Sequence, residues 1–323
     1  MRAIGFKSVR GALIQLDRPV SVPGDGEVLI QVSHAGVNFA ELQHWRGDFG
    51  PPEPDGDVPG LEAAGVVAAV GPDVGNVAVG DPVTAYLPGF GGYAEYVLAP
   101  AAFTYPIGDL DRTVAAAAPT VLTTAYGLLA GTGRIVAGDT VLIHAAAGGV
   151  GTVAAQLARA LGAGRVLGTV GSLEKVEYAE GFGYDAVLLR EGFSEEVRQL
   201  TGGRGVDLVL DPVGGSVRAE SIELLAPFGR LAAFGDAGGY PDLTLQVQPL
   251  WKNIRLVGGF NIGDLARRAP EAVSRFGRAA LDLVRSGQVR IDVTDVLPLA
   301  EAKVALDRLA SATTRGKLVL AVG

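Results

Sequence analysis

The pattern of hydrophobic and polar positions changes near residue 120. Before it, short apolar and β-branched runs lie between Gly, Pro and Asp residues, which is typical of a small β barrel or sandwich. They predict strands at 27–33, 63–70, 80–86 and 92–97. After it, apolar runs alternate with segments of helical periodicity, which indicates parallel strands joined by crossover helices. They predict strands at 140–145, 165–170, 186–189, 206–210, 230–234 and 254–258.

The C-terminal segment after Gly263 changes again. It predicts helices at 272–286 and 299–312, a strand that ends at Pro298 and a final strand at 316–321. We expect this tail to return to the first part of the chain. The sequence therefore predicts an α/β protein with a β-rich, discontinuous domain of residues 1–119 and 264–323 and a doubly wound parallel sheet within residues 120–263.

A glycine-rich turn follows the predicted buried strand Thr140–His144. The motif Ala146-x-Gly148-x-x-Gly151 leads into a predicted helix at 152–161. Unpaired backbone N–H groups and the positive end of a helix dipole bind a dinucleotide pyrophosphate at such a turn, and small residues let the backbone approach. We expect this contact from Gly148, Gly149, Val150 and Gly151. The first glycine of the usual motif is Ala146 here, so a turn without a ligand stays open as the other interpretation.

The next strand, Arg165–Val170, ends in Gly171. A site for NAD usually has Asp or Glu at this strand end, where the carboxylate binds the adenosine ribose. Glycine followed by Ser172 and Lys175, with Arg190 after the next strand, favours the 2′-phosphate of NADPH over NADH. Glu174, a carboxylate in the same loop, does not fit a phosphate-binding cluster. The alternative is that Ser172 caps a helix whose exposed first turn holds Glu174 and Lys175.

Composition and charge narrow the class of protein. The chain has 323 residues, 48% hydrophobic and 19% charged, and a net charge of −8 with no basic block, which argues against nucleic acid as a partner. It has no cysteine, so it has no disulfide, thiolate metal site or cysteine nucleophile. The N-terminus lacks the apolar core of a signal peptide, and no long apolar stretch predicts a membrane span. We therefore expect a cytoplasmic protein.

Several motifs together resemble a known family. They are Gly36-Val-Asn38-Phe39, Pro59-Gly60-Leu61-Glu62-Ala-Ala-Gly65, Gly80-Asp81-Pro82-Val83, Gly92-Tyr-Ala-Glu-Tyr96, Ala145-Ala-Ala-Gly-Gly-Val-Gly151, Asp211-Pro-Val-Gly214 and Arg315-Gly-Lys-Leu-Val319. In this order, over essentially the whole chain, they resemble the medium-chain dehydrogenase/reductase superfamily, specifically its zinc-independent quinone oxidoreductase branch. The resemblance implies a discontinuous GroES-like catalytic domain beside a Rossmann domain, with the active site in the cleft between them.

The resemblance also bears on metal binding. Asn38 stands where zinc-dependent relatives have their first cysteine ligand, and Leu61 stands where they have a histidine. The histidines of this chain, His34, His44 and His144, are dispersed, and His34 and His144 lie in predicted strands. We expect His144 to be a packed or hydrogen-bonded core residue. The sequence therefore predicts no metal site.

Without a Lewis acid, reduction of a conjugated acceptor is easier than oxidation of an alcohol. The resemblance therefore implies an NADPH-dependent reductase of quinones or enones, acting as a homodimer that pairs the strand within 251–260 across a two-fold axis. One alternative is an enoyl-thioester reductase of lipid or polyketide synthesis. The other is an NADPH-binding structural or regulatory protein without turnover.

The resemblance places further residues at the cofactor. Asn38, Phe39, Glu41 and Gln43 would line the nicotinamide end, with Thr124 facing them from the Rossmann side. Asn38 would donate a hydrogen bond to the carboxamide or to the substrate oxygen, unless it caps the helix that starts at Phe39. The other implied cofactor contacts are Phe234 and Gly235 at the adenine or ribose, Gly259, Phe260 and Asn261 at the nicotinamide, and Lys317, which is otherwise a surface lysine.

The source of the proton is less defined. Relatives often carry tyrosines after the equivalent of Asn38, but this chain has none before Tyr86. His44 is the only group there that titrates near neutrality, so it is the candidate proton donor unless it is a helix-surface histidine or solvent supplies the proton. Trp45, Phe49 and Phe90 form either an apolar wall for the substrate or part of the core.

Overall fold

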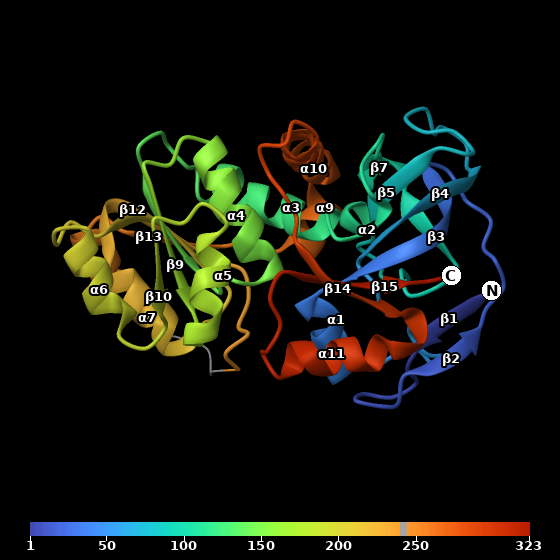
Figure 1. Ribbon diagram of the computed structural model, residues 1–323, viewed down its shortest axis with the longest axis horizontal. Coiled ribbons are helices and arrows are strands. Elements are labelled where there is room, and N and C mark those ends of the chain that lie inside the picture. The colour runs from blue at the N-terminus through green and yellow to red at the C-terminus, as the bar shows by residue number, and fades with distance from the viewer. Residues whose placement is uncertain (240–243) are drawn as a thin grey trace. The chain divides into compact units, whose positions relative to one another are not determined.

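The computed structural model describes residues 1–239 and 244–323 (Figure 1). The chain divides into two compact units. The first consists of Met1–Val121, Ala269–Arg285 and Ile291–Gly323, and the second of Leu122–Arg268 and Ser286–Arg290. The tail predicted to return to the first part of the chain does so, because its last strand lies beside an N-terminal strand (Figure 1).

The first unit is built on a sheet that is mostly antiparallel. Its strands follow the order β14 (Val293–Pro298), β15 (Lys317–Ala321), β3 (Glu27–Val37), β4 (Glu62–Val70), β5 (Pro82–Tyr86) and β7 (Thr104–Pro106), with β6 (Tyr96–Pro100) paired to β3. A separate pair is formed by β1 (Arg2–Gly5) and β2 (Ile14–Asp17). The helices are α1 (Phe39–Arg46), α2 (Arg112–Ala116), α10 (Pro270–Arg285) and α11 (Ala302–Ala310).

Side chains along β3 point alternately to the two faces of the sheet, and those on one face form part of the core of this unit. Val28, Ile30 and Val32 are buried, whereas Gln31 between them is exposed. The strand predicted at 92–97 is wrong in position, since β6 begins only at Tyr96. The backbone of Tyr93 bonds instead to Pro59 and Ile4, which lie outside β6 and its sheet partner.

The second unit confirms the predicted doubly wound parallel sheet. Its strands follow the order β10 (Ala186–Leu189), β9 (Arg165–Val170), β8 (Thr140–His144), β11 (Val206–Asp211), β12 (Leu225–Ala233) and β13 (Leu256–Gly259), and all pair in parallel. The helices around it are α3 (Pro119–Tyr126), α4 (Gly149–Ala160), α5 (Val176–Glu180), α6 (Phe193–Leu200), α7 (Gly215–Glu223), α8 (Val247–Lys252) and α9 (Ile262–Arg268). α3 begins in the first unit and ends in the second.

The strand order reverses between β8 and β11, because the chain moves outward to β9 and β10 and then returns to the other side of β8. In parallel sheets, ligands bind beyond the carboxyl ends of the strands at such a reversal. The loops after β8, β9, β10, β12 and β13 share this edge. Among the described residues, no helix combines the length and the apolar character needed to cross a membrane.

Candidate functional site

The glycine turn joins β8 to the N-terminus of α4. Ala145 adopts a left-handed conformation with φ 56°, and the helix begins at Gly149 after its N-cap, Gly148. The N–H of Thr152 already bonds to the carbonyl of Gly148 at 3.0 Å, so the N–H groups before it form the open end of the helix. A Cβ on Gly151 would lie 2.4 Å from the carbonyl oxygen of Ala145. Gly151 therefore lets the helix pack against its own turn.

Ala146 replaces the usual glycine without disturbing this turn. Its N–H donates to the carbonyl of Thr169 at 2.9 Å, and its side chain is buried. The facing residue on β9 is Gly168, where an added Cβ would lie 2.8 Å from the Ala146 methyl. The space that a glycine usually leaves here is thus provided by Gly168 on the neighbouring strand.

His144 anchors the end of β8 and is the core residue that the sequence predicts. Its Nδ1 lies 2.7 Å from Thr169 Oγ1 and its Nε2 lies 2.8 Å from Ser221 Oγ. Ser221 donates its own proton to the carbonyl of Val217, so its oxygen accepts from His144 Nε2–H, and Thr169 donates to Nδ1. Burial lowers the pKa of His144 to about 4, so the imidazole is neutral at neutral pH.

Arg190 lies beside Gly171 at the edge of the sheet. The nearest guanidinium nitrogen is 3.6 Å from where a Cβ on Gly171 would be. Arg190 Nε is buried and has no hydrogen-bond partner among the described residues. A buried N–H donor without a partner is costly unless a ligand completes it. These two residues fit an anion at the end of β9.

The other predicted phosphate residues lie in the same loop. Leu173–Lys175 is a 3₁₀ turn before α5. The Ser172 hydroxyl lies 3.3 Å from the carboxylate of Glu174, and its side chain does not cap the turn. Ser172 thus occupies the N-cap position that the alternative gives it, but without a side-chain capping bond.

The loops after β12 and β13 hold the predicted adenosine and nicotinamide contacts. Phe234 and Gly235 are half-buried, and the N–H of Phe234 donates to the carbonyl of Asp211 at 3.0 Å. Gly259 ends β13, Phe260 donates to the carbonyl of Ala233 at 2.8 Å, and the side chain of Asn261 accepts the N–H of Asp264 at 2.9 Å. Thr124 is buried on α3.

The first unit contains a buried ionic cluster, formed by Asn38, Glu41, Glu62 and Lys317. The Lys317 ammonium donates to Glu62 Oε1 at 2.7 Å, to Asn38 Oδ1 at 2.6 Å and to the carbonyl of Val37 at 2.8 Å. The Lys317 side chain is 3% exposed, so the alternative of a surface lysine is wrong. An ammonium has only three N–H donors. A contact between Lys317 and a cofactor would therefore replace one of these bonds.

Asn38 and Glu41 join the ionic cluster to the start of α1. Asn38 is the N-cap of α1, and its amide nitrogen donates to Glu62 at 2.9 Å and to Glu41 at 3.3 Å. Glu41 accepts the backbone N–H groups of Asn38 and Leu61. Glu41 is completely buried, so the expectation that it lines the nicotinamide is wrong. Burial raises the pKa of Glu41 to about 7, against the charge of Lys317 and these hydrogen bonds.

Glu62 is the member of the ionic cluster to which the sequence assigned no role. A Cβ on Gly36 would lie 2.3 Å from Glu62 Oε1, so glycine at this position makes room for the carboxylate. The other oxygen accepts the N–H of Thr120 at 2.8 Å. In the sequence, a role for Glu62 is indicated only by the family motifs, because Gly36 and Glu62 both lie in motifs that carry the resemblance.

His44 is buried, so the alternative of a helix-surface histidine is wrong. Its Nε2 lies 2.7 Å from Asp57 Oδ2, and its ring centroid lies 4.2 Å from that of Phe90. Nδ1 is buried without a partner among the described residues. Because both ring nitrogens are enclosed, the geometry weighs against His44 as a proton donor. Asp57 lies in an irregular segment, where it forms only an isolated bridge with Phe6, so no periodic pattern in the sequence indicates it.

The remaining residues after Asn38 differ in exposure. Trp45 donates its indole N–H to the carbonyl of Gly11 at 2.7 Å and packs against the core, as its core interpretation requires. Phe49 is 56% exposed and lies near Phe90, with ring centroids 6.2 Å apart. Phe39 and Gln43 are partly buried on α1.

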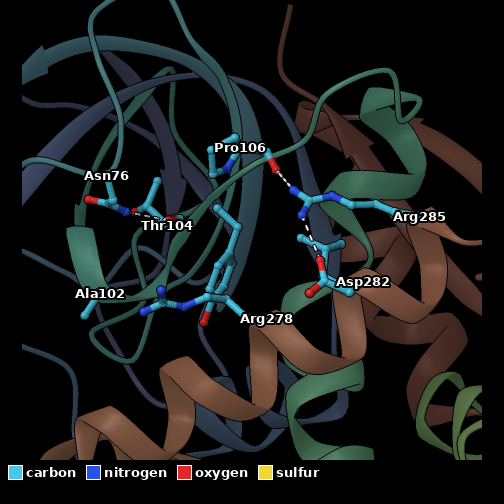
Figure 2. Close-up of a pocket in the computed structure, with 9 residues that line it drawn as sticks. Asn76, Ala102, Thr104, Pro106, Arg278, Asp282 and Arg285 are labelled. Carbon is cyan, nitrogen blue, oxygen red and sulfur yellow. Dashed lines mark hydrogen bonds and ion pairs between the residues drawn. The ribbon is translucent and has the colours of Figure 1, made fainter.

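A hollow of about 320 Å³ lies in the first unit, away from all predicted site residues (Figure 2). Figure 2 shows Arg285 reaching both Asp282 and the carbonyl of Pro106, with the Asp282 contact at 3.0 Å. Arg278 donates to the hydroxyl of Ser274 at 2.7 Å. The charged groups of this hollow thus have partners within the protein. Among the described residues, no group of His, Cys, Asp and Glu side chains is arranged to hold a metal ion.

Comparisons with known proteins agree with this geometry. Residues 24–109 match the family model of the alcohol dehydrogenase GroES-like domain, and residues 149–278 match that of the zinc-binding dehydrogenases. The chain is 35% identical over 318 residues to 2-haloacrylate reductase of a Burkholderia species, covering 93% of this chain and 92% of that protein. It is also 34% identical over 304 residues to highly-reducing polyketide synthase 1 of Aureobasidium melanogenum, but it spans only 14% of that protein's length.

Solved structures extend the likeness to the whole chain. A mycobacterial protein in complex with NADPH superposes with a TM-score of 0.91 at 35% identity, covering 100% of both chains. The quinone oxidoreductase of Escherichia coli in complex with NADPH superposes with a TM-score of 0.90 at 28% identity, also covering 100% of both chains. The chain therefore belongs to the medium-chain dehydrogenase/reductase superfamily, in its quinone oxidoreductase-like branch.

Proposed function

We propose that this protein is a zinc-independent, NADPH-dependent reductase of conjugated carbonyl compounds, namely quinones or enones. The observation that supports it most is the carboxyl edge of the parallel sheet. There an open helix N-terminus lies after β8, and Arg190, whose Nε has no partner within the part of the chain that the structure describes, lies beside Gly171. Both features suit a phosphorylated dinucleotide. Relatives of about the same length are 2-haloacrylate reductase and proteins solved in complex with NADPH, one of them a quinone oxidoreductase.

Different residues at the carboxyl edge of the sheet bind different parts of the dinucleotide. The N–H groups of Gly149, Val150 and Gly151, after Gly148, bind the pyrophosphate. Arg190, with Ser172 and Lys175 in the loop after Gly171, binds the 2′-phosphate. Phe234 and Gly235 bind the adenine or a ribose, and the nicotinamide half meets Gly259, Phe260, Asn261 and Thr124.

When bound, NADPH supplies the hydride, and a conjugated acceptor takes it without a Lewis acid because the resulting negative charge is delocalised. We assign to Asn38 the hydrogen bond to the carboxamide or to the acceptor oxygen. Its 3.3 Å contact with Glu41 is the longest of its amide contacts, and it is the one that a carboxamide or substrate oxygen would replace. We assign the proton to solvent, because both nitrogens of His44 are enclosed.

The test is NADPH oxidation with 1,4-quinones, 2-alkenals and crotonyl thioesters, followed by absorbance. We expect turnover with quinones or enones, and a lower Kd for NADPH than for NADH. Tight NADPH binding without turnover of any acceptor would contradict the proposal and favour a structural or regulatory protein. No NADPH binding would overturn it entirely.

A second candidate is an enoyl-thioester reductase. It is favoured by the likeness to a segment of a highly-reducing polyketide synthase, which covers 92% of this chain. A higher kcat/KM with crotonyl thioesters than with quinones or 2-alkenals would establish this alternative.

We also propose a homodimer formed along β13. Among the strands that the structure describes, β13 is the last of its sheet, and the apolar side chains of Trp251, Ile254 and Leu256 around it are exposed. Sedimentation should give the mass of two chains, and Leu256→Asp should give a monomer. A wild-type monomer at assay concentrations would contradict this. A cytoplasmic location stays a prediction from the sequence.

A further inference from the structure

Tyr184 connects the start of β9 to the N-terminus of α4. It lies in the loop before β10, next to Asp185. The N–H of Asp185 donates to the carbonyl of Val166 at 2.8 Å, and its carboxylate accepts the N–H of Val166 at 2.7 Å. From this anchored backbone the Tyr184 side chain reaches α4, where its hydroxyl donates to the carbonyl of Gly151 at 2.8 Å. Both ends of the side chain are therefore fixed.

The ring of Tyr184 occupies a space that a glycine on β9 leaves free. A Cβ on Gly168 would lie 2.7 Å from Cε1 of Tyr184 and 2.8 Å from the methyl group of Ala146. Val166 and Gly168 are two residues apart on the strand, so they share one face of the sheet. Gly168 thus makes room both for the alanine of the glycine turn and for the tyrosine that passes beside it.

Gly151 is held from two sides. On one side a Cβ on Gly151 would lie 2.4 Å from the carbonyl oxygen of Ala145 and 2.7 Å from that of Ala146, so the helix packs closely on its own turn. On the other side is the hydroxyl of Tyr184, which is 8% exposed. Burial raises the pKa of Tyr184 well above its usual value, so the phenol stays protonated and donates at neutral pH. The first turn of α4 is therefore fixed between the glycine turn and Tyr184.

We infer that Tyr184 is a positioning residue that holds the N–H groups at the start of α4 in the orientation that binds the pyrophosphate. This inference rests on the proposed function, which assigns the pyrophosphate to the N–H groups of residues 149–151. Tyr184 acts through the carbonyl of Gly151, and its buried hydroxyl does not itself contact the nucleotide. The 2′-phosphate, which the proposed function assigns to Arg190 and the loop after Gly171, does not depend on this hydrogen bond.

The test compares NADPH with adenosine 2′-monophosphate, which has the 2′-phosphate but no pyrophosphate. Tyr184→Phe keeps the ring against Gly168 and removes only the hydroxyl. We expect the Kd for NADPH to rise about fivefold, because one hydrogen bond that orients the helix donors is lost. The Kd for adenosine 2′-monophosphate, and kcat at saturating NADPH, should stay within about twofold of wild type. NADPH fluorescence and isothermal titration calorimetry measure the two dissociation constants.

Thr201→Val is the matched control. Thr201 follows α6, and its hydroxyl also donates to a helix carbonyl, that of Val197, at 2.8 Å. It accepts the N–H of Gly205 at 3.2 Å as well, so its loss disturbs the fold at least as much. α6 leads into β11, which places Thr201 at the amino edge of the sheet, opposite the proposed nucleotide site. We expect both variants to lower the melting temperature, but only Tyr184→Phe to weaken NADPH binding.

An unchanged NADPH Kd in Tyr184→Phe would overturn the inference alone. Equal losses for NADPH and adenosine 2′-monophosphate, or an equal rise of the NADPH Kd in Thr201→Val, would do the same, because the hydroxyl would then have a general structural role. Wild-type protein that does not bind NADPH would overturn the proposed function and this inference with it. A fivefold loss confined to NADPH and to Tyr184→Phe would support the inference.

Discussion

Lys317 and Arg190 carry the same charge in opposite surroundings. Lys317, in the first unit, directs its ammonium to Glu62, Asn38 and Val37 and is almost completely buried. Arg190, in the second unit, lies beside Gly171 with a buried Nε that has no partner among the described residues. Both residues were predicted to bind the cofactor. The difference teaches that a satisfied buried cation maintains a fold, whereas an incompletely satisfied one indicates a ligand.

The ionic cluster formed by Asn38, Glu41, Glu62 and Lys317 supports the start of α1. At the carboxyl edge of the parallel sheet, by contrast, the hydrogen-bond donors are available to a ligand. They are the backbone N–H groups at the N-terminus of α4 and the guanidinium of Arg190 beside Gly171. The following predictions test this contrast, from the largest expected effect to the smallest.

Replacing Lys317 with Met should destabilise the protein most. It leaves the carboxylate of Glu62 buried without its cation, which typically costs about 3–5 kcal/mol. Urea unfolding measures the loss. Arg308→Met is the control, because it breaks an exposed pair with Asp295 and should cost less than about 1 kcal/mol. Equal losses in the two variants would show that the ionic cluster is not structural.

The pKa of His144 predicts sensitivity to acid. Folding lowers this pKa from 6.5 to about 4, so the unfolded chain binds the proton more readily than the native one. The contribution of His144 to stability is therefore complete above pH 6.5 and is lost as the pH falls to about 4, by about 3 kcal/mol. Urea unfolding across this range should show a shallower pH dependence for His144→Gln than for wild type. Identical slopes would contradict the prediction.

Arg190→Gln should weaken NADPH binding about 10- to 100-fold, because a charge-assisted hydrogen bond to phosphate contributes about 1.5–3 kcal/mol. The Kd for NADH should change less than about threefold, since NADH lacks the 2′-phosphate. Arg165→Gln, at the opposite end of β9, is the control and should affect neither Kd. Equal effects of Arg190→Gln on both nucleotides would rule out the phosphate role.

Gly151→Ala should have the smallest of these effects, a rise of about tenfold in the NADPH Kd. The added methyl group would lie 2.4 Å from the carbonyl oxygen of Ala145, so α4 must move away from its turn. In Gly181→Ala the added Cβ would have its nearest contact at 3.4 Å, and this control should bind normally. Normal binding by Gly151→Ala would mean that the helix N-terminus does not hold the pyrophosphate.

Much of the second unit could be predicted because its signals are local. Runs of Val, Leu and Ile lie close to the observed parallel strands, and the glycine turn lies within a few residues of β8. The surroundings of Lys317 and Asp57 could not be predicted. Lys317 meets Asn38 across nearly the whole length of the chain, and Asp57 pairs with His44 from an irregular loop. Such pairs leave no periodic pattern in a single sequence.

By itself, the sequence determined the parallel strands of the second unit, the change from a β-rich to a doubly wound region and the turn at Gly151, because backbone preference and side-chain periodicity act between neighbours. Only the tertiary structure decided which charged residues are satisfied by the protein and which are left for a ligand. Folding brings residues from distant segments together, and burial then sets the free energy of each charge according to the partners it finds.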